Sequence, residues 1–144
     1  MKVLADTSVL VAAMVEQHPD HESAFPWLLK AQKREVELAV CSHTLAELYA
    51  VLTTLPVRPR LSPDTVRRLI RTSIEPTAAV VALSAEDYRK ALDAMSVLGL
   101  SGGVVYDALA VRAAQKAAVD KLLTFNVADF RRAWPEGGDR VVQP

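Results

Sequence analysis

The segment Lys2-Val3-Leu4-Ala5-Asp6-Thr7-Ser8 decides the fold class of this chain. Its short apolar run is typical of a buried strand, and the polar Asp-Thr-Ser that follows indicates a turn into a helix. We expect Thr7 or Ser8 to cap that helix, which should run from Val9 to about Glu16. A buried strand that passes directly into a helix is typical of the repeating unit of an α/β sheet fold.

The same alternation of strand and helix recurs along the rest of the chain. Further strands are predicted at Val36–Cys41, Ala79–Leu83, Lys121–Thr124 and Arg140–Val142. Helices are predicted at about Glu22–Arg34, Ser42–Leu55, Pro63–Ser73, Ser84–Gly99, Val104–Ala118 and Asp129–Trp134, with Ser84 and Asp87 forming a capping box. We find no repeat and no dividing linker, so residues 1–144 should form one domain with a mostly parallel sheet covered on both faces.

Three carboxylates stand almost alone in apolar sequence. Asp6 is the only charged residue from 3 to 15, Glu47 the only carboxylate from 38 to 61, and Asp107 the only charged residue from 100 to 111. An ionised carboxylate in an apolar interior is costly unless it pairs, takes up a proton or binds a metal. The economical interpretation is that the three converge and share a hard divalent cation.

These acids, together with Asp129, occupy equivalent places after strands. In open α/β sheets, functional groups gather at the carboxyl ends of the strands. Asp6 ends the first strand, Glu47 and Asp107 lie in the opening turns of helices, and Asp129 follows a strand by five residues. Glu47 and Asp107 share helix faces with mostly small or apolar neighbours, so both should point toward the core side. One edge of the sheet can therefore hold all four acids.

Three of the acids also have a purely structural interpretation. Thr44-x-x-Glu47 fits a capping box, Asp6 fits a turn residue after a strand, and Asp129 is ordinary at a short helix start. Asp107 is the hardest to explain in this way. Several independent coincidences are less economical than one shared cause.

Carboxylates without a partner His or Cys favour hard cations such as Mg²⁺ or Mn²⁺. His18, His21 and His43 have no metal-ligand spacing with another His or Cys. A carboxylate-held cation suits phosphodiester hydrolysis, because it activates a water and offsets charge on the phosphoryl group. The residues leave the choice between one and two cations open. Crowded anions raise one another's pKa values, so metal should bind more weakly as the pH falls.

Charge and cysteine content narrow the partners and the location. The 17 basic and 17 acidic residues balance, so any nucleic-acid binding must come from local patches. Five arginines fall between Arg58 and Arg71 against the single acid Asp64, which indicates either a site for RNA or another partner, or a solvated helix face. Cys41, the only cysteine, is expected to be an inert core residue. No signal peptide or membrane span is recognisable, so we expect a cytoplasmic protein.

Four motifs resemble those of the PIN-domain family and, within it, the small VapC-like toxins of bacterial toxin–antitoxin pairs. Val3-Leu4-Ala5-Asp6-Thr7-Ser8 resembles the family's first strand with Asp-x-Ser/Thr, and Thr44-Leu45-Ala46-Glu47-Leu48 resembles its second-acid helix. Tyr106-Asp107-Ala108-Leu109-Ala110 is similar to the third-acid segment, and Leu122-Leu123-Thr124-Phe125-Asn126-Val127-Ala128-Asp129-Phe130 to the closing segment. Each motif is weak alone, but all four in this order are specific.

The resemblance implies a three-layer α/β/α Rossmann-like PIN domain. It also implies a Mg²⁺- or Mn²⁺-dependent endoribonuclease toxin that acts on structured or translation-related RNA, forms a homodimer and is inhibited by a small VapB-like antitoxin. The implied catalytic residues are Asp6, Glu47, Asp107 and Asp129, with Asp6 and Asp107 as metal ligands and with Ser8 and Asn126 supporting the site. Some family members carry Asp at the position of Asn126 and gain a further acid there. Because Asn126 is neutral, the resemblance does not decide whether a second metal binds, although Asp129 remains available as a ligand.

Three other classes compete with this interpretation. An aspartic protease would need glycine in place of Ser8 and an all-β chain, and an aspartate-nucleophile phosphatase would need an acid at that position. A non-cleaving PIN-like module that binds RNA or protein stays open, although the presence of all the acids argues against it. The sequence does not identify which RNA would be cut.

Overall fold

A computed structural model describes residues 1–144 and contains one five-stranded sheet. The strand order is β3-β2-β1-β4-β5, and every neighbouring pair is parallel. The strands are β1 (Lys2–Ala5), β2 (Glu37–Cys41), β3 (Ala78–Val81), β4 (Lys121–Leu123) and β5 (Val141–Val142). The helices are α1 (Thr7–Met14), α2 (His21–Gln32), α3 (Ser42–Thr54), α4 (Pro63–Leu69), α5 (Ala85–Leu98), α6 (Val104–Ala117) and α7 (Val127–Ala133). The predicted α/β fold with a parallel sheet is confirmed.

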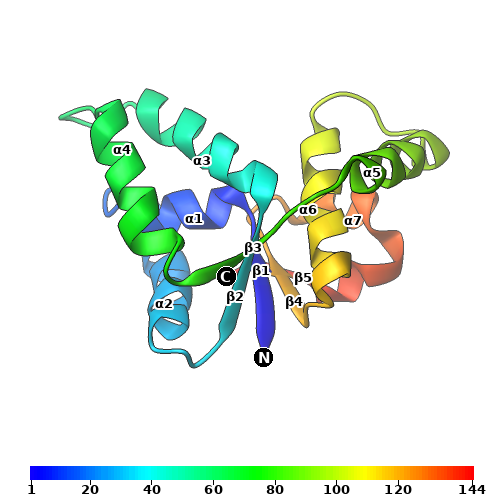
Figure 1. Cartoon of the computed structure of the whole chain (residues 1–144), viewed down its shortest axis with the longest axis horizontal. Helices are drawn as coiled ribbons and strands as arrows, with labels where there is room; N and C mark the ends of the chain where they lie inside the picture. The colour runs from blue at the N-terminus through cyan, green and yellow to red at the C-terminus, as the bar shows by residue number, and fades with distance from the viewer.

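Helices cover both faces of the sheet, which gives three layers (Figure 1). Helices α1 to α4 lie on one side, and α5 to α7 lie on the other. Within β1, Val3 packs into the apolar cluster of the first side, and its neighbour Leu4 packs into the cluster of the second side. Successive side chains of a strand point to opposite faces. Because both faces are buried, the strands read in sequence as continuous apolar runs.

Two helix boundaries and one additional helix differ from the prediction. Helix α1 begins at Thr7 and its cap is Asp6, which keeps an extended backbone and accepts a hydrogen bond from the Val9 N–H, so the expected cap at Thr7 or Ser8 is wrong. The helix predicted to reach Ser73 is α-helical only to Leu69 and continues as a π-helical turn, Ile70–Ile74. A 3₁₀ helix, Pro135–Arg140, was not predicted. Its Gly137 lies against the Trp134 ring, where any Cβ would clash.

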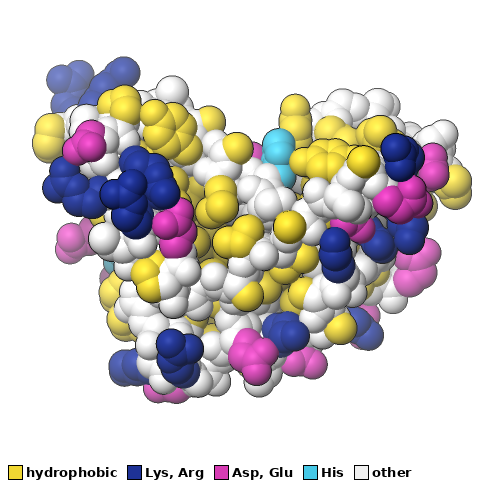
Figure 2. Space-filling view, in the orientation of Figure 1, with side chains coloured by type: hydrophobic (Ala, Val, Ile, Leu, Met, Phe, Trp, Pro, Cys, Tyr) yellow, Lys and Arg dark blue, Asp and Glu magenta, His cyan; other side chains and the backbone are white.

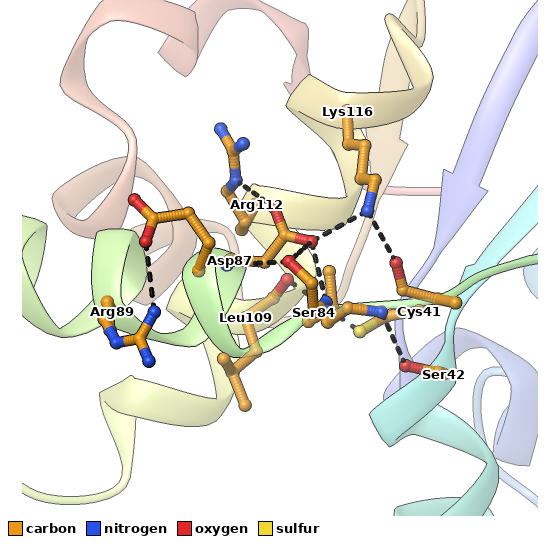
Figure 3. A network of polar contacts seen from close by, with 11 residues as sticks. Cys41, Ser42, Ser84, Asp87, Arg89, Leu109, Arg112 and Lys116 are labelled. Atoms are coloured by element: carbon orange, nitrogen blue, oxygen red, sulfur yellow. Dashed lines mark hydrogen bonds and ion pairs between the residues drawn. The ribbon is translucent and has the colours of Figure 1, made fainter.

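An ionic cluster ties α5 to α6 on the second face (Figure 3). Ser84 and Asp87 form the predicted capping box at the start of α5. Asp87 is only 3% exposed and also accepts hydrogen bonds from Arg112 Nε at 2.9 Å and Lys116 Nζ at 2.8 Å, both on α6. The Lys116 contact, with the Ser84 N–H and Arg112, holds the pKa of Asp87 well below its usual range. This cluster fixes α6 against the start of α5.

Cys41 lies in the core, as predicted. It is 1% exposed, its thiol lies 3.8 Å from the carbonyl oxygen of Leu109, and burial raises its pKa. A protonated thiol with a raised pKa is a poor nucleophile.

No helix of the structure has the length and apolar character that a transmembrane segment requires.

Candidate active site

The carboxyl ends of the central strands bring three of the predicted acids to one cavity. Asp6 follows β1, Glu47 lies in the second turn of α3 after β2, and Asp107 lies in the first turn of α6. All three line a cavity of about 70 Å³, and Ser8 and Asn126 line it as well. β1 lies between β2 and β4, where the order of the strands changes direction, the usual place for a site in an open α/β sheet.

The cavity lies at the end of the sheet where α3 and α6 diverge (Figure 1). Figure 2 shows a notch between the two lobes on this side of the molecule. One lobe contains α3 and α4, and the other contains α5 and α6. The acids therefore come from both lobes and from the strand between them.

Asp129 does not line the cavity, in contrast to the other three acids. Its carboxylate accepts a hydrogen bond from Arg132 at 2.6 Å, one turn further along α7. Its negative charge nevertheless contributes to the raised pKa of Asp107, so it lies near the site. The structure therefore places Asp129 at the margin of the acid group, where its carboxylate is already paired with the guanidinium of Arg132.

Asp6 is buried, with 5% exposure, and only neutral groups donate to it. Its Oδ1 accepts hydrogen bonds from the Ser8 hydroxyl at 2.6 Å and the Val9 N–H at 3.2 Å, and its Oδ2 accepts one from the Thr124 hydroxyl at 2.7 Å. Burial raises the pKa of Asp6, and these hydrogen bonds partly offset the rise. Because a carboxylate has about four acceptor positions, about one remains, on Oδ2.

Two hydroxyls orient Asp6, and sequence reasoning assigned this role to only one of them. Ser8 donates to Asp6 and accepts from the Phe125 N–H at 3.1 Å, which is the kind of contact expected of it. Thr124 is fully buried after β4, and its hydroxyl likewise donates to Asp6 and accepts a hydrogen bond from the Asn126 N–H at 2.9 Å. The signal for Thr124 was its position at the end of a predicted strand. The exposed side chain of Asn126 makes no hydrogen bond, so its supporting role stays a prediction.

Glu47 is half-buried beside Asp6. Burial raises its pKa, the nearby His43 lowers it, and the charge of Asp6 raises it further. His43 Nε2 lies 3.9 Å from Glu47 Oε1. The capping-box interpretation of Thr44 and Glu47 is wrong, because Cys41 is the N-cap residue of α3 and Thr44 lies inside the helix.

The carboxyl of Asp107 is also strongly perturbed. Burial is the largest cause, followed by the negative charges of Asp6, Asp129 and Glu47, and together they raise the pKa of Asp107 to about 7. Arg132 lowers it, but not enough to compensate. A carboxyl with this pKa is about half protonated at neutral pH. The acids therefore repel one another, which is the electrostatic condition for uptake of a cation.

The donor set fits a small hard cation that keeps part of its water. The acids and hydroxyls of the cavity provide oxygen donors, which suit Mg²⁺ or Mn²⁺. A water takes up about 30 Å³, so the cavity has room for an ion and a water or two. No three side chains among His, Cys, Asp and Glu are close enough together to hold an ion as a group. A cation would therefore have one or two carboxylate ligands, and not all three acids as the sequence suggested, and would complete its shell with water, as Mg²⁺ commonly does.

Comparison with known proteins now defines the class. Residues 3–133 match the PIN domain family model. The chain is 37% identical over 109 residues to Ribonuclease VapC27 of Mycobacterium tuberculosis, which covers 76% of this chain and 74% of the relative. It is 38% identical over 122 residues to Ribonuclease VapC40 of the same organism, covering 85% and 84%. The chain belongs to the PIN-domain family and, within it, to the VapC-like group.

Solved structures agree on the fold. VapC20 of Mycobacterium tuberculosis, described as a Sarcin-Ricin loop cleaving toxin, matches with a TM-score of 0.70 and 18% identity, over 92% of this chain and 95% of that one. VapBC2 of Rickettsia felis, solved bound to a DNA fragment from their promoter, matches with a TM-score of 0.68 and 21% identity, over 100% and 99%. At these identities the likeness concerns the fold alone.

Proposed function

We propose that this chain is a divalent-cation-dependent endoribonuclease toxin that a small VapB-like antitoxin inhibits. One observation carries the proposal: Asp6, Glu47 and Asp107 line one cavity, and no Lys or Arg forms an ion pair with any of them. The unbalanced negative charge calls for a cation. The names of VapC27 and VapC40, both ribonucleases, support the same activity.

In this proposal Asp6 and Asp107 hold Mg²⁺ or Mn²⁺. A bound cation would lower the pKa of an attacking water and offset charge on the phosphoryl group. Ser8 and Thr124 keep the Asp6 carboxylate in one orientation, so that its remaining acceptor position does not rotate away. Glu47 is half-buried with a raised pKa, so it is suited to accept a proton from the water. Asp129 adds negative charge at the margin.

The partners follow from the family. VapBC2 supports a VapB-like antitoxin as the inhibitor. The description of VapC20 supports structured, translation-related RNA as the substrate class.

For the proposed homodimer, α5 carries candidate contacts, because its Leu92 is 55% and its Val97 87% exposed. Light scattering on the purified protein would measure the oligomeric state, and the cytoplasmic location stays a prediction.

The test is cleavage of RNA by the purified, antitoxin-free protein. We expect new RNA ends with Mg²⁺ or Mn²⁺, none with EDTA, and none with the Asp107→Asn variant. Sequencing the ends would identify the target. Cleavage that persists in EDTA, or the same ends from Asp107→Asn, would overturn the proposal. Tight RNA binding without any new ends would instead support the non-cleaving module.

A further inference from the structure

An open groove adjoins the acid cavity between α3 and α6. It has a volume of about 290 Å³ and is lined by His43, Ala46, Glu47, Ala50 and Tyr106. Glu47 and Tyr106 also line the acid cavity, so the two spaces share a wall. A molecule in the groove would therefore lie directly beside the proposed reaction centre.

Two aromatic rings from different elements form one side of this groove. The rings of His43 on α3 and Tyr106 on α6 stack with their centroids 5.1 Å apart and their planes at 7°. Tyr106 is 49% exposed and directly precedes Asp107 in the chain. Ala46 and Ala50 lie one turn apart on α3, and their small side chains leave room for a flat group to approach the rings.

We propose that this groove is a nucleobase subsite, in which a base next to the cleaved phosphate stacks on the His43–Tyr106 pair. The inference rests on the proposed ribonuclease function. The acid cavity, at about 70 Å³, takes an ion and water, whereas the groove, at about 290 Å³, has room for a flat ring. Aromatic side chains commonly bind unpaired bases in this way.

The subsite limits the class of RNA that this protein would cut. A base can stack on a protein ring only after it leaves its own helix, so the nucleotide beside the cleaved bond has to be unpaired. Every base has a flat face, so stacking alone tolerates many sequences. The groove therefore selects loops, bulges or single strands by their shape, and base identity would have to be read elsewhere.

The probes are short single-stranded RNA oligomers in which 2-aminopurine replaces one base at a time. Its fluorescence is measured in EDTA, where a cation-dependent nuclease does not cut. We expect the wild-type protein to quench 2-aminopurine at one position of the RNA. Tyr106→Leu should weaken RNA binding about 5- to 140-fold, the loss typical of a stacked base, and Tyr106→Phe should bind RNA like the wild type. Ala50→Leu, which fills the groove without changing either ring, should also weaken binding.

Tyr49→Ala is the matched control, because Tyr49 is a 40% exposed tyrosine on α3 that does not line the groove. It should bind like the wild type. The proposal is overturned if 2-aminopurine is quenched at no position of the RNA, or if Tyr106→Leu binds RNA normally. It is also overturned if Tyr49→Ala loses as much RNA affinity as Tyr106→Leu. A Tyr106→Leu variant that loses only thermal stability, or only antitoxin binding, would assign the ring pair to packing or to a protein interface and likewise overturn it.

Cleavage assays separate this proposal from the function on which it rests. If the wild type cuts RNA and Tyr106→Leu does so with unchanged KM and kcat, the subsite fails and the ribonuclease stands. If the wild type cuts no RNA but quenching depends on Tyr106, the ribonuclease fails and the base-binding groove stands.

Discussion

Two aspartates of this chain are equally buried but have opposite electrostatic surroundings. Asp87 is 3% exposed, contacts Arg112 and Lys116, and has a pKa well below its usual range. Asp6 is 5% exposed, accepts hydrogen bonds only from neutral donors, and has a pKa raised by burial. The difference between them lies in the partners and not in the burial.

The comparison separates a carboxylate that stabilises the fold from a candidate site residue. The charge of Asp87 is balanced within the chain, so it needs nothing from outside. The charges of Asp6 and Asp107 are not balanced, and a fold that buries such groups loses stability unless a ligand compensates. The absence of an internal cation is therefore a better indicator of a site than burial alone.

The largest expected effect concerns activity. Asp107→Asn should reduce RNA cleavage by at least about 100-fold, because the cation contributes several kcal/mol to the transition state. Asp87→Asn should keep a near-normal rate per folded molecule. Initial rates, divided by the folded fraction from circular dichroism, measure both. Similar losses in the two variants would remove the distinction between the aspartates.

Thermal stability should depend on Asp87 more than on Asp107, the reverse of the order expected for activity. Asp87→Ala removes the acceptor of Arg112 and Lys116 as well as part of the α5 cap, so the melting temperature should fall by several degrees. In metal-free buffer Asp107→Asn should melt at the wild-type temperature or above it. Thermal unfolding followed by circular dichroism tests this, and a stable Asp87→Ala would show that the cluster has no structural role.

Cation binding should stabilise only proteins with an intact acid group. At a cation concentration one hundred times Kd, the free energy of unfolding should rise by about 2.7 kcal/mol. Asp87→Asn, in which the acid group is intact, should gain a similar amount and Asp107→Asn much less. Calorimetric titration with Mg²⁺ or Mn²⁺ measures the uptake directly. No uptake by the wild type would remove the cation from the proposal.

The pH dependence follows from the raised pKa of Asp107. Its pKa of about 7 in the folded protein lies above the ordinary aspartate value of 3.8, so the folded state binds more protons between these pH values. The stability of the metal-free protein should therefore decrease as the pH rises from 4 to 7, by about 1–2 kcal/mol after allowance for solvent screening. Urea unfolding across this range tests the slope. The slope should be smaller in Asp107→Asn but not zero, because burial also raises the pKa values of Asp6 and Glu47, and an unchanged slope there would assign the effect to those groups.

The smallest effect should come from the arginine segment, whose positive charges gather over α4 and the loop before it (Figure 2). Arg67 and Arg68 each form an ion pair with a neighbouring acid, whereas Arg58 and Arg60 form none. Charge reversal of Arg67 and Arg68 should weaken RNA or antitoxin binding a few-fold, and reversal of Arg58 and Arg60 somewhat more. Binding measured at several salt concentrations checks the electrostatic origin. If neither pair matters, the segment is a solvated surface.

Much of the fold could be predicted because its signals are local. Apolar runs, Pro63 after Ser62, and the capping box at Ser84 each lie within a few residues, and the corresponding elements are present. The π-helical turn and the 3₁₀ helix could not be predicted, because they depend on packing. Gly137, for example, lies against the ring of Trp134, where any larger residue would clash.

The candidate site shows the same limit. The placement of Asp6, Glu47 and Asp107 at one edge could be predicted, because strand ends and helix starts are visible in the sequence. The Thr124 hydroxyl on Asp6 and the stacking of His43 on Tyr106 could not, because each joins segments far apart in the chain. Such pairs depend on strand order and helix packing, which no local pattern specifies.

The hydrogen bond from Thr124 to Asp6 spans 118 positions of the chain and has a consequence for biosynthesis. Chains are made from the amino terminus, and β1 meets its neighbour β4 only when about the last sixth of the protein is being synthesised. An incomplete chain on the ribosome therefore has its acids but not the strand that holds the central one in place. The Asp6 carboxylate therefore reaches its final orientation only when the synthesis of the chain is nearly complete.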